Sequence, residues 1–492
     1  MKKTLHINKD FIFYFILFLV GMVCFGFLGE TGYQWYKDSN TYANIKAAEG
    51  VMPIYPIFLY INQKIFGDMW KEVVVWEQVI LASLCVMNFV GYMKKQFGLK
   101  IWEVGLVYIA CLLPFSIELP GYMVSHMILT EGIAYPLFYL FMKYLLRAVF
   151  EISYKNFCRL LGMAFILSLT RSQLQLLYII CAAVFLYISL KQNKKDIKFR
   201  KVLFSIGASV LLILMCVFVT MKTFGFYINQ VSSYLADDSG ENSDTKEKAI
   251  SGAQFNSVIF NRGFFEADET DENLFVSEED KEIFSILFEA IDKEQARYSY
   301  AEPGLWMWKQ LRTGDVGVIG FQVLVKYYEE KEPGLVSTAL YNQISEKMAY
   351  MGGKVLVTHF GRYIYHSVRL MIPSLINTVF FQVESIYLLC HIIMAFLYAS
   401  AICMCFIYRF QMKKKSQAVD YRLIEYMAVV IIINVIFAGV SNFIFEGIQR
   451  YVVYAFGIFY IAYYLIFRQI VTEWINSKKE KKHENISGDT SL

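Results

Sequence analysis

The stretch from Phe11 to Leu28 reads FIFYFILFLVGMVCFGFL and holds no charged side chain. A transmembrane helix needs roughly 20 mostly apolar residues, so this run and its flanks are long enough to cross a bilayer. The basic start Met1-Lys2-Lys3 precedes it, but the run ends in bulky residues and lacks the small-x-small pattern of a signal-peptide cleavage site. We therefore expect it to remain as the first membrane span.

Comparable stretches recur along the chain, and the composition agrees with them. The chain has 492 residues, of which 57% are hydrophobic and 18% are charged, whereas soluble domains carry about 25% charged residues. We therefore predict an all-α polytopic membrane protein with about ten transmembrane helices. The expected spans are residues 10–29, 72–93, 101–118, 127–149, 157–172, 174–190, 202–222, 383–409, 422–445 and 449–470.

Lysine and arginine residues are concentrated in every second connection between these spans and at both ends of the chain. Short cytoplasmic loops are enriched in these residues. We therefore expect the basic connections and both termini in the cytoplasm of a multi-pass plasma-membrane protein. The remaining connections are expected outside, and they are residues 30–71, 119–126, 171–173, 223–382 and 446–448.

The long exterior connection is acidic and is expected to be mostly helical. Ser277 has the position of an N-cap for a helix that runs to Ala296. Residues 354–378 are expected to form one interfacial helix on the outer leaflet, with basic side chains along one face. None of the nine cysteines lies in this connection, which argues against a disulfide-stapled exterior domain and a cysteine zinc site.

These observations divide the chain into four parts. An N-terminal transmembrane module is followed by the acidic exterior segment, by further transmembrane helices and by a basic cytoplasmic tail. Their expected bounds are residues 1–222, 223–382, 383–470 and 471–492.

The first exterior loop carries the residue for which we expect a chemical role. Residues 32–42 read GYQWYKDSNTY, so Asp38 stands among aromatic and polar side chains soon after the first span. A carboxylate at the membrane surface can meet a lipid head group and an aqueous acceptor together, and it can serve as a general base. The alternative is that Asp38 only caps a short helix.

Three more charged residues stand at the expected outer ends of spans. Glu131 opens the fourth span, where an ionisable group usually faces a cavity or a partner, although a helix N-terminus also favours glutamate. Arg171 interrupts two apolar runs and could bind a phosphate bidentately or snorkel to lipid head groups. Arg450 opens the last span, where the helix dipole disfavours a cation and thus indicates an anionic partner. The chain contains no GxxxxGK[ST], HExxH or GxSxG motif, so an ATP-driven pump or a serine hydrolase is unsupported.

Taken in order, these residues resemble the motifs of the GT-C superfamily of membrane glycosyltransferases, above all those of protein O-mannosyltransferases and lipid A aminoarabinose transferases. Members carry an acidic residue in the first exterior loop, a proline-rich aromatic stretch before the second span, a Ser/Thr-Glu pair at the fourth, a Leu-Thr-Arg element near the fifth and a late Arg-Tyr pair. The matching positions are Asp38, Pro53-Ile54-Tyr55-Pro56, Thr130-Glu131, Leu169-Thr170-Arg171 and Arg450-Tyr451.

The resemblance covers residues 1–222 well and the last two spans loosely, and it does not extend to residues 223–382. Many members have two adjacent acidic residues in the first loop, whereas Ser39 follows Asp38 here. Met52 precedes the proline-rich stretch where a histidine is common in relatives. A second carboxylate, such as that of Glu131, would have to serve for binding of a metal or of the acceptor. The question of a divalent metal therefore stays open, and no other cofactor is implied.

The resemblance implies an inverting transfer of a sugar from a polyprenyl-phosphate donor to an envelope acceptor outside the membrane. Asp38 would deprotonate the acceptor. The implied partners are the lipid-linked sugar and membrane lipids, with the acceptor open, and the net charge of +4 gives no indication of a nucleic acid. The residues expected to bind substrate are Glu131, Arg171, Arg450, Tyr451, Tyr55 and Arg362.

Two other functions remain as alternatives. A transporter or flippase of envelope precursors would place ionisable residues near the middle of the bilayer and often shows internal repeats, neither of which is evident here. A polymerase or ligase of surface polysaccharide would use the same lipid-phosphate donor but attach whole chains.

Overall fold

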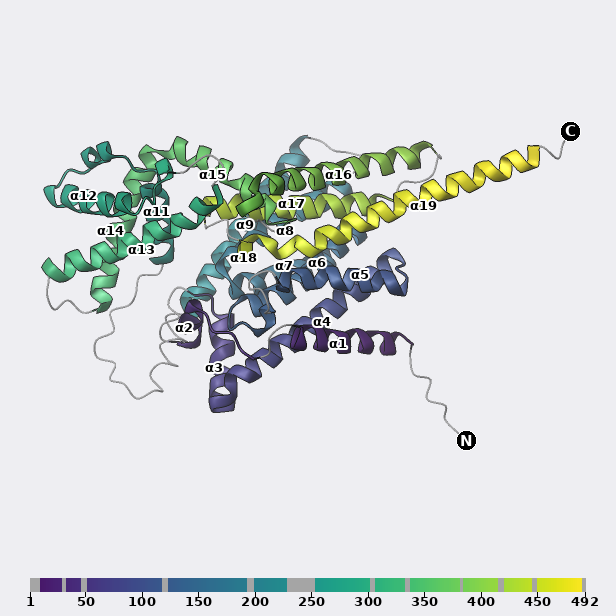
Figure 1. Ribbon diagram of the computed structural model, residues 1–492, viewed down its shortest axis with the longest axis horizontal. Helices are drawn as coiled ribbons and strands as arrows, with labels where there is room; N and C mark the ends of the chain where they lie inside the picture. Colours follow the sequence, from purple (N-terminus) through teal and green to yellow (C-terminus); the bar gives the residue numbers. More distant parts are fainter. Residues whose placement is uncertain are drawn as a thin grey trace.

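The computed structural model is built from helices, and no regular strand occurs in the part of the chain that it describes. Figure 1 shows an elongated bundle of long helices with a second helical bundle at one end. The described residues are 9–28, 32–45, 51–116, 123–192, 199–227, 253–300, 306–331, 337–380, 384–414, 420–444 and 449–488. The expected connection 446–448 lies outside them, as do parts of 30–71, 119–126 and 223–382.

Eight helical segments among these residues are long and apolar enough to cross a membrane. The expectation of an all-α polytopic membrane protein is thereby confirmed, while the number of ten crossings stays a prediction. Two expected spans correspond to the shorter helices α5 (Ile101–Leu112) and α7 (Tyr154–Thr170). The eight segments contain α1 (Lys9–Phe27), α3 (Ile54–Phe66) with α4 (Trp70–Phe97), α6 (Glu131–Glu151), α8 (Leu177–Gln192), α9 (Phe199–Phe226), α16 (Tyr387–Lys414), α17 (Tyr421–Ile444) and α19 (Phe456–Gly488).

Helix α6 lies at the centre of the bundle, in contact with α4, α7, α8 and α17. Its aromatic side chains hold the start of the last span. Tyr135 packs edge-on against Tyr454 with ring centroids 4.9 Å apart. Phe437 of α17 stacks on the same Tyr454 ring at 5.2 Å. Aromatic pairs of this kind add about 0.5–1.5 kcal/mol beyond their buried area. They therefore stabilise the packing of α6 and α17 against the residues that lead into α19.

The segment that is expected outside the membrane forms a bundle with its own apolar core, and we call it the exterior bundle. Helices α11 and α14 cross most closely, because a Cβ added at Gly352 would collide with the backbone of Phe260. The side chain of Ser277 accepts a hydrogen bond from the Asp280 amide at 3.0 Å, which confirms the expected N-cap. The four helices of this exterior bundle are α11 (Ala253–Phe265), α12 (Glu278–Lys293), α13 (Trp306–Lys331) and α14 (Ser337–Thr358).

The expected single helix over 354–378 is wrong, because the chain breaks at His359 between α14 and α15 (Phe360–Ile376). Helix α15 packs against α17 and against α18 (Gln449–Val452) and thereby connects the exterior bundle to the membrane bundle. Its opposite side leaves Phe360, Tyr365 and Val368 exposed. An exposed apolar face beside membrane spans fits the expected position on the outer leaflet, which stays a prediction.

The arrangement of the ends agrees with the predicted sidedness. In Figure 1 the exterior bundle and α2 (Lys37–Ala43) lie toward one end of the molecule, whereas α1 begins and α19 ends toward the other. Several apolar helices indicate a multi-pass membrane protein. The cytoplasmic position of the termini stays a prediction.

Candidate functional site

The first exterior loop is fastened to the segment that precedes α6. The Gln34 amide donates to the His126 carbonyl at 2.8 Å, and the Ile128 amide donates to the Gln34 carbonyl at 3.0 Å. The buried hydroxyl of Ser39 donates to the Ile128 carbonyl at 2.9 Å. These three bonds hold α2 beside the start of α6 and so place Asp38 near the first turn of that helix.

A glutamine inside the helix bundle also binds the segment that precedes α6. Gln78 is fully buried in α4, and its amide nitrogen donates to the carbonyls of Ser125 and Met127 at 2.9 and 3.0 Å. The hydroxyl of Tyr55 donates to its amide oxygen at 3.1 Å. Tyr55 therefore lies behind the site as a supporting side chain. Gln78 was missed in the sequence, where the signal is the polar pair Glu77-Gln78 within a long apolar run.

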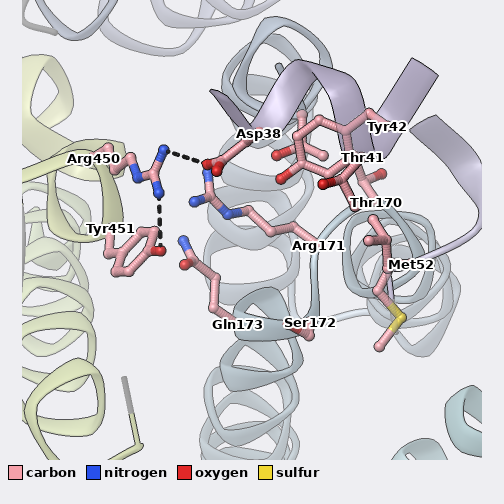
Figure 2. A pocket seen from close by; sticks show the side chains of 12 residues that line it. Asp38, Thr41, Tyr42, Met52, Thr170, Arg171, Ser172, Gln173, Arg450 and Tyr451 are labelled. Carbon is pink, nitrogen blue, oxygen red and sulfur yellow. Dashed lines mark hydrogen bonds and ion pairs between the residues drawn. The ribbon is translucent and has the colours of Figure 1, made fainter. Parts of the chain in front are cut away.

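Four charged side chains from distant parts of the chain meet at this point. Arg450 Nη1 lies 3.1 Å from Asp38 Oδ2, an ion pair visible in Figure 2. The Glu131 carboxylate forms an ion pair with Arg171 and lies 3.9 Å from Arg450 Nε. The side chain of Glu131 is 1% exposed, whereas that of Asp38 is 43% exposed. The buried carboxylate of Glu131 thus lies beside both arginines. The carboxylate of Asp38 contacts Arg450 and is accessible to solvent.

An aromatic ring fixes the orientation of both guanidinium groups. The ring of Tyr451 lies 4.7 Å from the guanidinium carbon of Arg171 and 5.2 Å from that of Arg450. Its hydroxyl accepts a hydrogen bond from Arg450 Nη2 at 3.3 Å. The hydroxyl of Tyr135 donates to the Arg450 carbonyl at 3.1 Å and anchors the backbone on α6. Contacts within the protein therefore hold both guanidinium groups in place.

A cavity of about 320 Å³ is lined by Asp38, Tyr451 and the two arginines. Its volume is within the size range of small-molecule sites. Thr41, Tyr42 and Gln173 also line the cavity. They were not proposed as site residues from the sequence, although each lies within four positions of Asp38 or Arg171. Burial raises the pKa of Tyr42, so its phenol stays protonated at neutral pH and can donate a hydrogen bond. Figure 2 shows the wall, which comprises Asp38, Thr41, Tyr42, Val51, Met52, Thr130, Thr170, Arg171, Ser172, Gln173, Arg450 and Tyr451.

The structure brings five of the seven expected site residues together: Asp38, Glu131, Arg171, Arg450 and Tyr451. Tyr55 supports them from behind, and Arg362 lies elsewhere.

Arg362 Nη2 pairs with Asp268 Oδ2 at 2.9 Å on the exterior bundle. Two other side chains of the same basic face are paired in the same way, since His359 contacts Asp271 and His366 contacts Glu266. The basic face of α15 thus binds the exterior bundle and does not reach the cavity.

The residues around the cavity do not fit a divalent metal. Asp38 is the only carboxylate among the described lining residues, and Arg450 already pairs with it. The carboxylate of Glu131 is enclosed by Arg171 and Arg450. The two guanidinium charges would repel a cation and balance the two carboxylates, so the arrangement suits an anion that can replace Asp38 on Arg450.

The fold and the cavity define a class, namely an all-α multi-pass membrane protein with a preformed, cation-lined cavity at one end of its helix bundle. Searches against protein-family models, curated proteins and solved structures find no match to this chain. The resemblance to the GT-C superfamily therefore stays a prediction.

Proposed function

We propose that the protein is a membrane glycosyltransferase that moves a sugar from a polyprenyl-phosphate donor to an envelope acceptor on the outer face of the plasma membrane. One observation carries this proposal. Two guanidinium groups, from Arg171 and Arg450, and the half-exposed carboxylate of Asp38 face the same cavity. The two cations can bind a lipid phosphate, and the carboxylate can act as the base that deprotonates a hydroxyl acceptor.

The donor phosphate would bind where Asp38 now contacts Arg450. Arg450 is 25% exposed and can exchange one anionic partner for another, whereas Arg171 is 10% exposed and is fixed by Glu131. At an effective dielectric constant of 20, two unit charges 4 Å apart attract each other by about 4 kcal/mol before desolvation costs. Binding of the phosphate would release the Asp38 carboxylate from its ion pair and leave it free to accept a proton.

The transfer would proceed as a single displacement at the anomeric carbon. The acceptor oxygen forms a bond to this carbon while the bond from the carbon to the phosphate oxygen breaks. Asp38 takes the acceptor's proton, and the polyprenyl phosphate leaves with the electron pair of the broken bond. Arg171 and Arg450 stabilise the charge that grows on the leaving phosphate. Attack opposite to the leaving group inverts the anomeric configuration.

The polar residues of the wall are suited to a sugar. Thr41, Gln173 and the protonated phenol of Tyr42 offer donors and acceptors beside the two cations. The cytoplasmic position of both termini is part of this proposal, because it puts the cavity on the outer side where lipid-linked sugars are used.

Binding of a polyprenyl phosphate tests the first half of the proposal. The full-length protein in detergent would be titrated with the lipid phosphate and, separately, with the matching polyprenol, which lacks the phosphate. We expect Arg450→Gln to weaken binding of the phosphate by about 1.5–3 kcal/mol, the usual worth of a charged hydrogen-bonded contact, and to leave binding of the polyprenol unchanged.

Arg468→Gln is the matched control, because Arg468 pairs with the buried Glu103 in a part of the protein predicted to be cytoplasmic. Equal binding of the phosphate by wild type and Arg450→Gln would contradict the proposal. Movement of the lipid between leaflets without sugar transfer would favour the transporter alternative, and transfer of whole chains would favour the polymerase alternative.

A further inference from the structure

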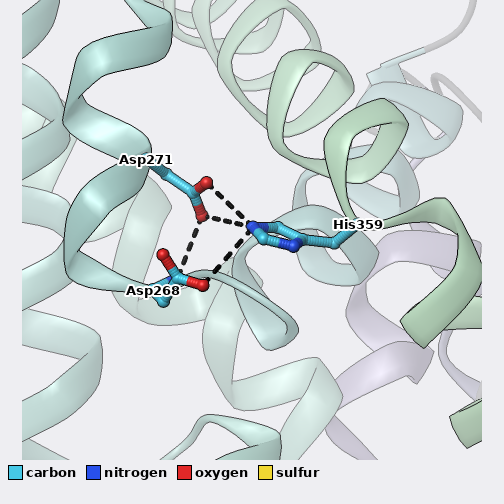
Figure 3. A group of neighbouring side chains, drawn as sticks. All are labelled: Asp268, Asp271 and His359. Atoms are coloured by element: carbon cyan, nitrogen blue, oxygen red, sulfur yellow. Dashed lines mark hydrogen bonds and ion pairs between the residues drawn. The ribbon is translucent and has the colours of Figure 1, made fainter.

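A second cluster of charged side chains lies in the exterior bundle, away from the cavity. Asp268 and Asp271 belong to the turn that contains η6 (Glu269–Leu274), and His359 stands at the break between α14 and α15. Figure 3 shows both carboxylates directed at the imidazole Nε2. Each residue offers one ligand atom such that all three atoms lie within 4.8 Å of one another.

The distances between these atoms approach those of a metal site. Nε2 of His359 lies 2.8 Å from Asp271 Oδ2 and 3.8 Å from Asp268 Oδ2. Neighbouring ligand atoms around a tetrahedral zinc ion stand about 3.3 Å apart, given bond lengths near 2.0–2.1 Å. Shifts of about half an ångström in opposite directions would therefore bring both nitrogen-to-oxygen distances to the spacing of tetrahedral ligands.

Two of the three ligands are buried and preordered. The side chains of Asp271 and His359 are 4% and 8% exposed. Asp271 Oδ2 accepts the Asp268 amide at 2.9 Å, which closes the turn, and the Thr270 hydroxyl donates to Asp268 Oδ1 at 2.6 Å. Outer hydrogen bonds of this kind orient ligating carboxylates in metal proteins.

The cluster around His359 differs from the neighbouring contact between His366 and Glu266 in the number of its carboxylates. The imidazole of His366 contacts one carboxylate, that of Glu266. His359 instead faces two carboxylates, and Arg362 contacts the outer one, Asp268. The Arg362 side chain is 52% exposed, so it can turn to solvent and leave Asp268 Oδ2 to another cation.

We propose that Asp268, Asp271 and His359 form a binding site for a divalent transition metal, for which Zn²⁺ is the best match. Zinc accepts both imidazole nitrogen and carboxylate oxygen as ligands, so all three side chains offer donors that suit it. Calcium and magnesium prefer six or more oxygen ligands, which three side chains with one nitrogen do not supply. Water would complete the coordination.

The position of this site gives the metal a structural task. It would join the turn of the exterior bundle to the first residue before α15, and α15 packs on α18, which carries Arg450. The metal would thereby fix the exterior bundle on the membrane bundle next to the candidate active cavity. The inference does not depend on the proposed sugar transfer, because it concerns other residues.

Zinc binding by the purified full-length protein tests the proposal. The protein would carry an affinity tag without histidine, would be stripped with EDTA, and would be titrated with Zn²⁺ followed by elemental analysis after gel filtration. We expect about one tightly held zinc per chain, and affinity lowered by at least about tenfold in Asp271→Asn and Asp268→Asn. Glu266→Gln is the matched control, because it removes the carboxylate of the neighbouring pair, and it should bind zinc like the wild type.

Thermal unfolding supplies a second measurement in case the buried Asp271 variant folds poorly. A ligand that binds only the folded state raises the unfolding temperature. At one fixed zinc concentration, Zn²⁺ should therefore raise it by less for Asp268→Asn, whose side chain is partly exposed, than for the wild type and Glu266→Gln. Sub-stoichiometric zinc in the wild type would overturn the proposal. Equal zinc affinity in wild type and Asp268→Asn, or a preference for Ca²⁺ over Zn²⁺, would also overturn it.

Discussion

Replacing the buried carboxylate beneath the cavity should destabilise the protein and disorder the side chain of Arg171. Glu131→Gln keeps the size of the side chain and removes its charge, and the Glu131 side chain is 1% exposed. Loss of one partner from a buried ion pair typically costs 3–5 kcal/mol. Arg450 keeps its 3.1 Å contact with Asp38, so the loss falls mainly on Arg171. We therefore expect the free energy of unfolding to fall by about 3 kcal/mol.

A double-mutant cycle separates this effect from a simple loss of packing. In Glu131→Gln/Arg171→Met neither side chain keeps an unpaired buried charge. We expect the double variant to be more stable than the sum of the single effects by about 2 kcal/mol, within the range found for contacting residues. The assay is denaturant unfolding of the full-length protein in mixed micelles, followed by tryptophan fluorescence.

Glu103→Gln provides the matched control. Glu103 is also nearly fully buried, and its carboxylate lies 2.6 Å from Arg468. This variant should lose stability in the same way and still bind the lipid phosphate normally, whereas Glu131→Gln should lose both. Strictly additive effects in the cycle would refute the buried ion pair, and normal phosphate binding by Glu131→Gln would refute its role in placing the arginines.

Three further predictions concern the supports of the fold. Gly352→Ala should destabilise the exterior bundle by about 1–3 kcal/mol, because the new methyl group meets the backbone of Phe260; limited proteolysis checks it. Ser39→Ala should cost about 1–3 kcal/mol by leaving a buried carbonyl without its donor; increased hydrogen exchange in the first exterior loop checks it. Burial alone would raise the pKa of Asp280, but the contact with Lys347 lowers it below its ordinary value. This pair therefore stabilises the bundle above about pH 3.9 and stops doing so as the pH falls through the lowered pKa, a loss that Asp280→Asn should remove from the unfolding profile.

The apolar helices and the charged residues of the site could be predicted because short stretches of sequence indicate both. An apolar run must cross the bilayer or be buried, so its length alone predicts a helix. Charges at the outer ends of such runs share one membrane surface, which is why Asp38, Arg171 and Arg450 could be expected near one another. The bundle then brings them into contact.

Other features depend on tertiary contacts that no local pattern reveals. Helix α6 begins at Glu131 and not at residue 127, because the preceding backbone pairs with Gln34 of a distant loop. Tyr55 was expected to touch the substrate, but its hydroxyl meets Gln78. The spacing of basic residues predicted one face of a helix around Arg362 without showing which acidic partners that face would meet.

Analysis of envelope glycans by mass spectrometry tests the central claim most directly. Cells that express the wild type, Asp38→Asn or the control Asp68→Asn, which changes an exposed carboxylate in the same predicted exterior loop, would be compared with cells that lack the protein. The account predicts a sugar-sized mass increment in cells with the wild type and Asp68→Asn, and its absence with Asp38→Asn at equal protein levels. A full increment with Asp38→Asn would contradict the account, as would identical glycans with and without the protein.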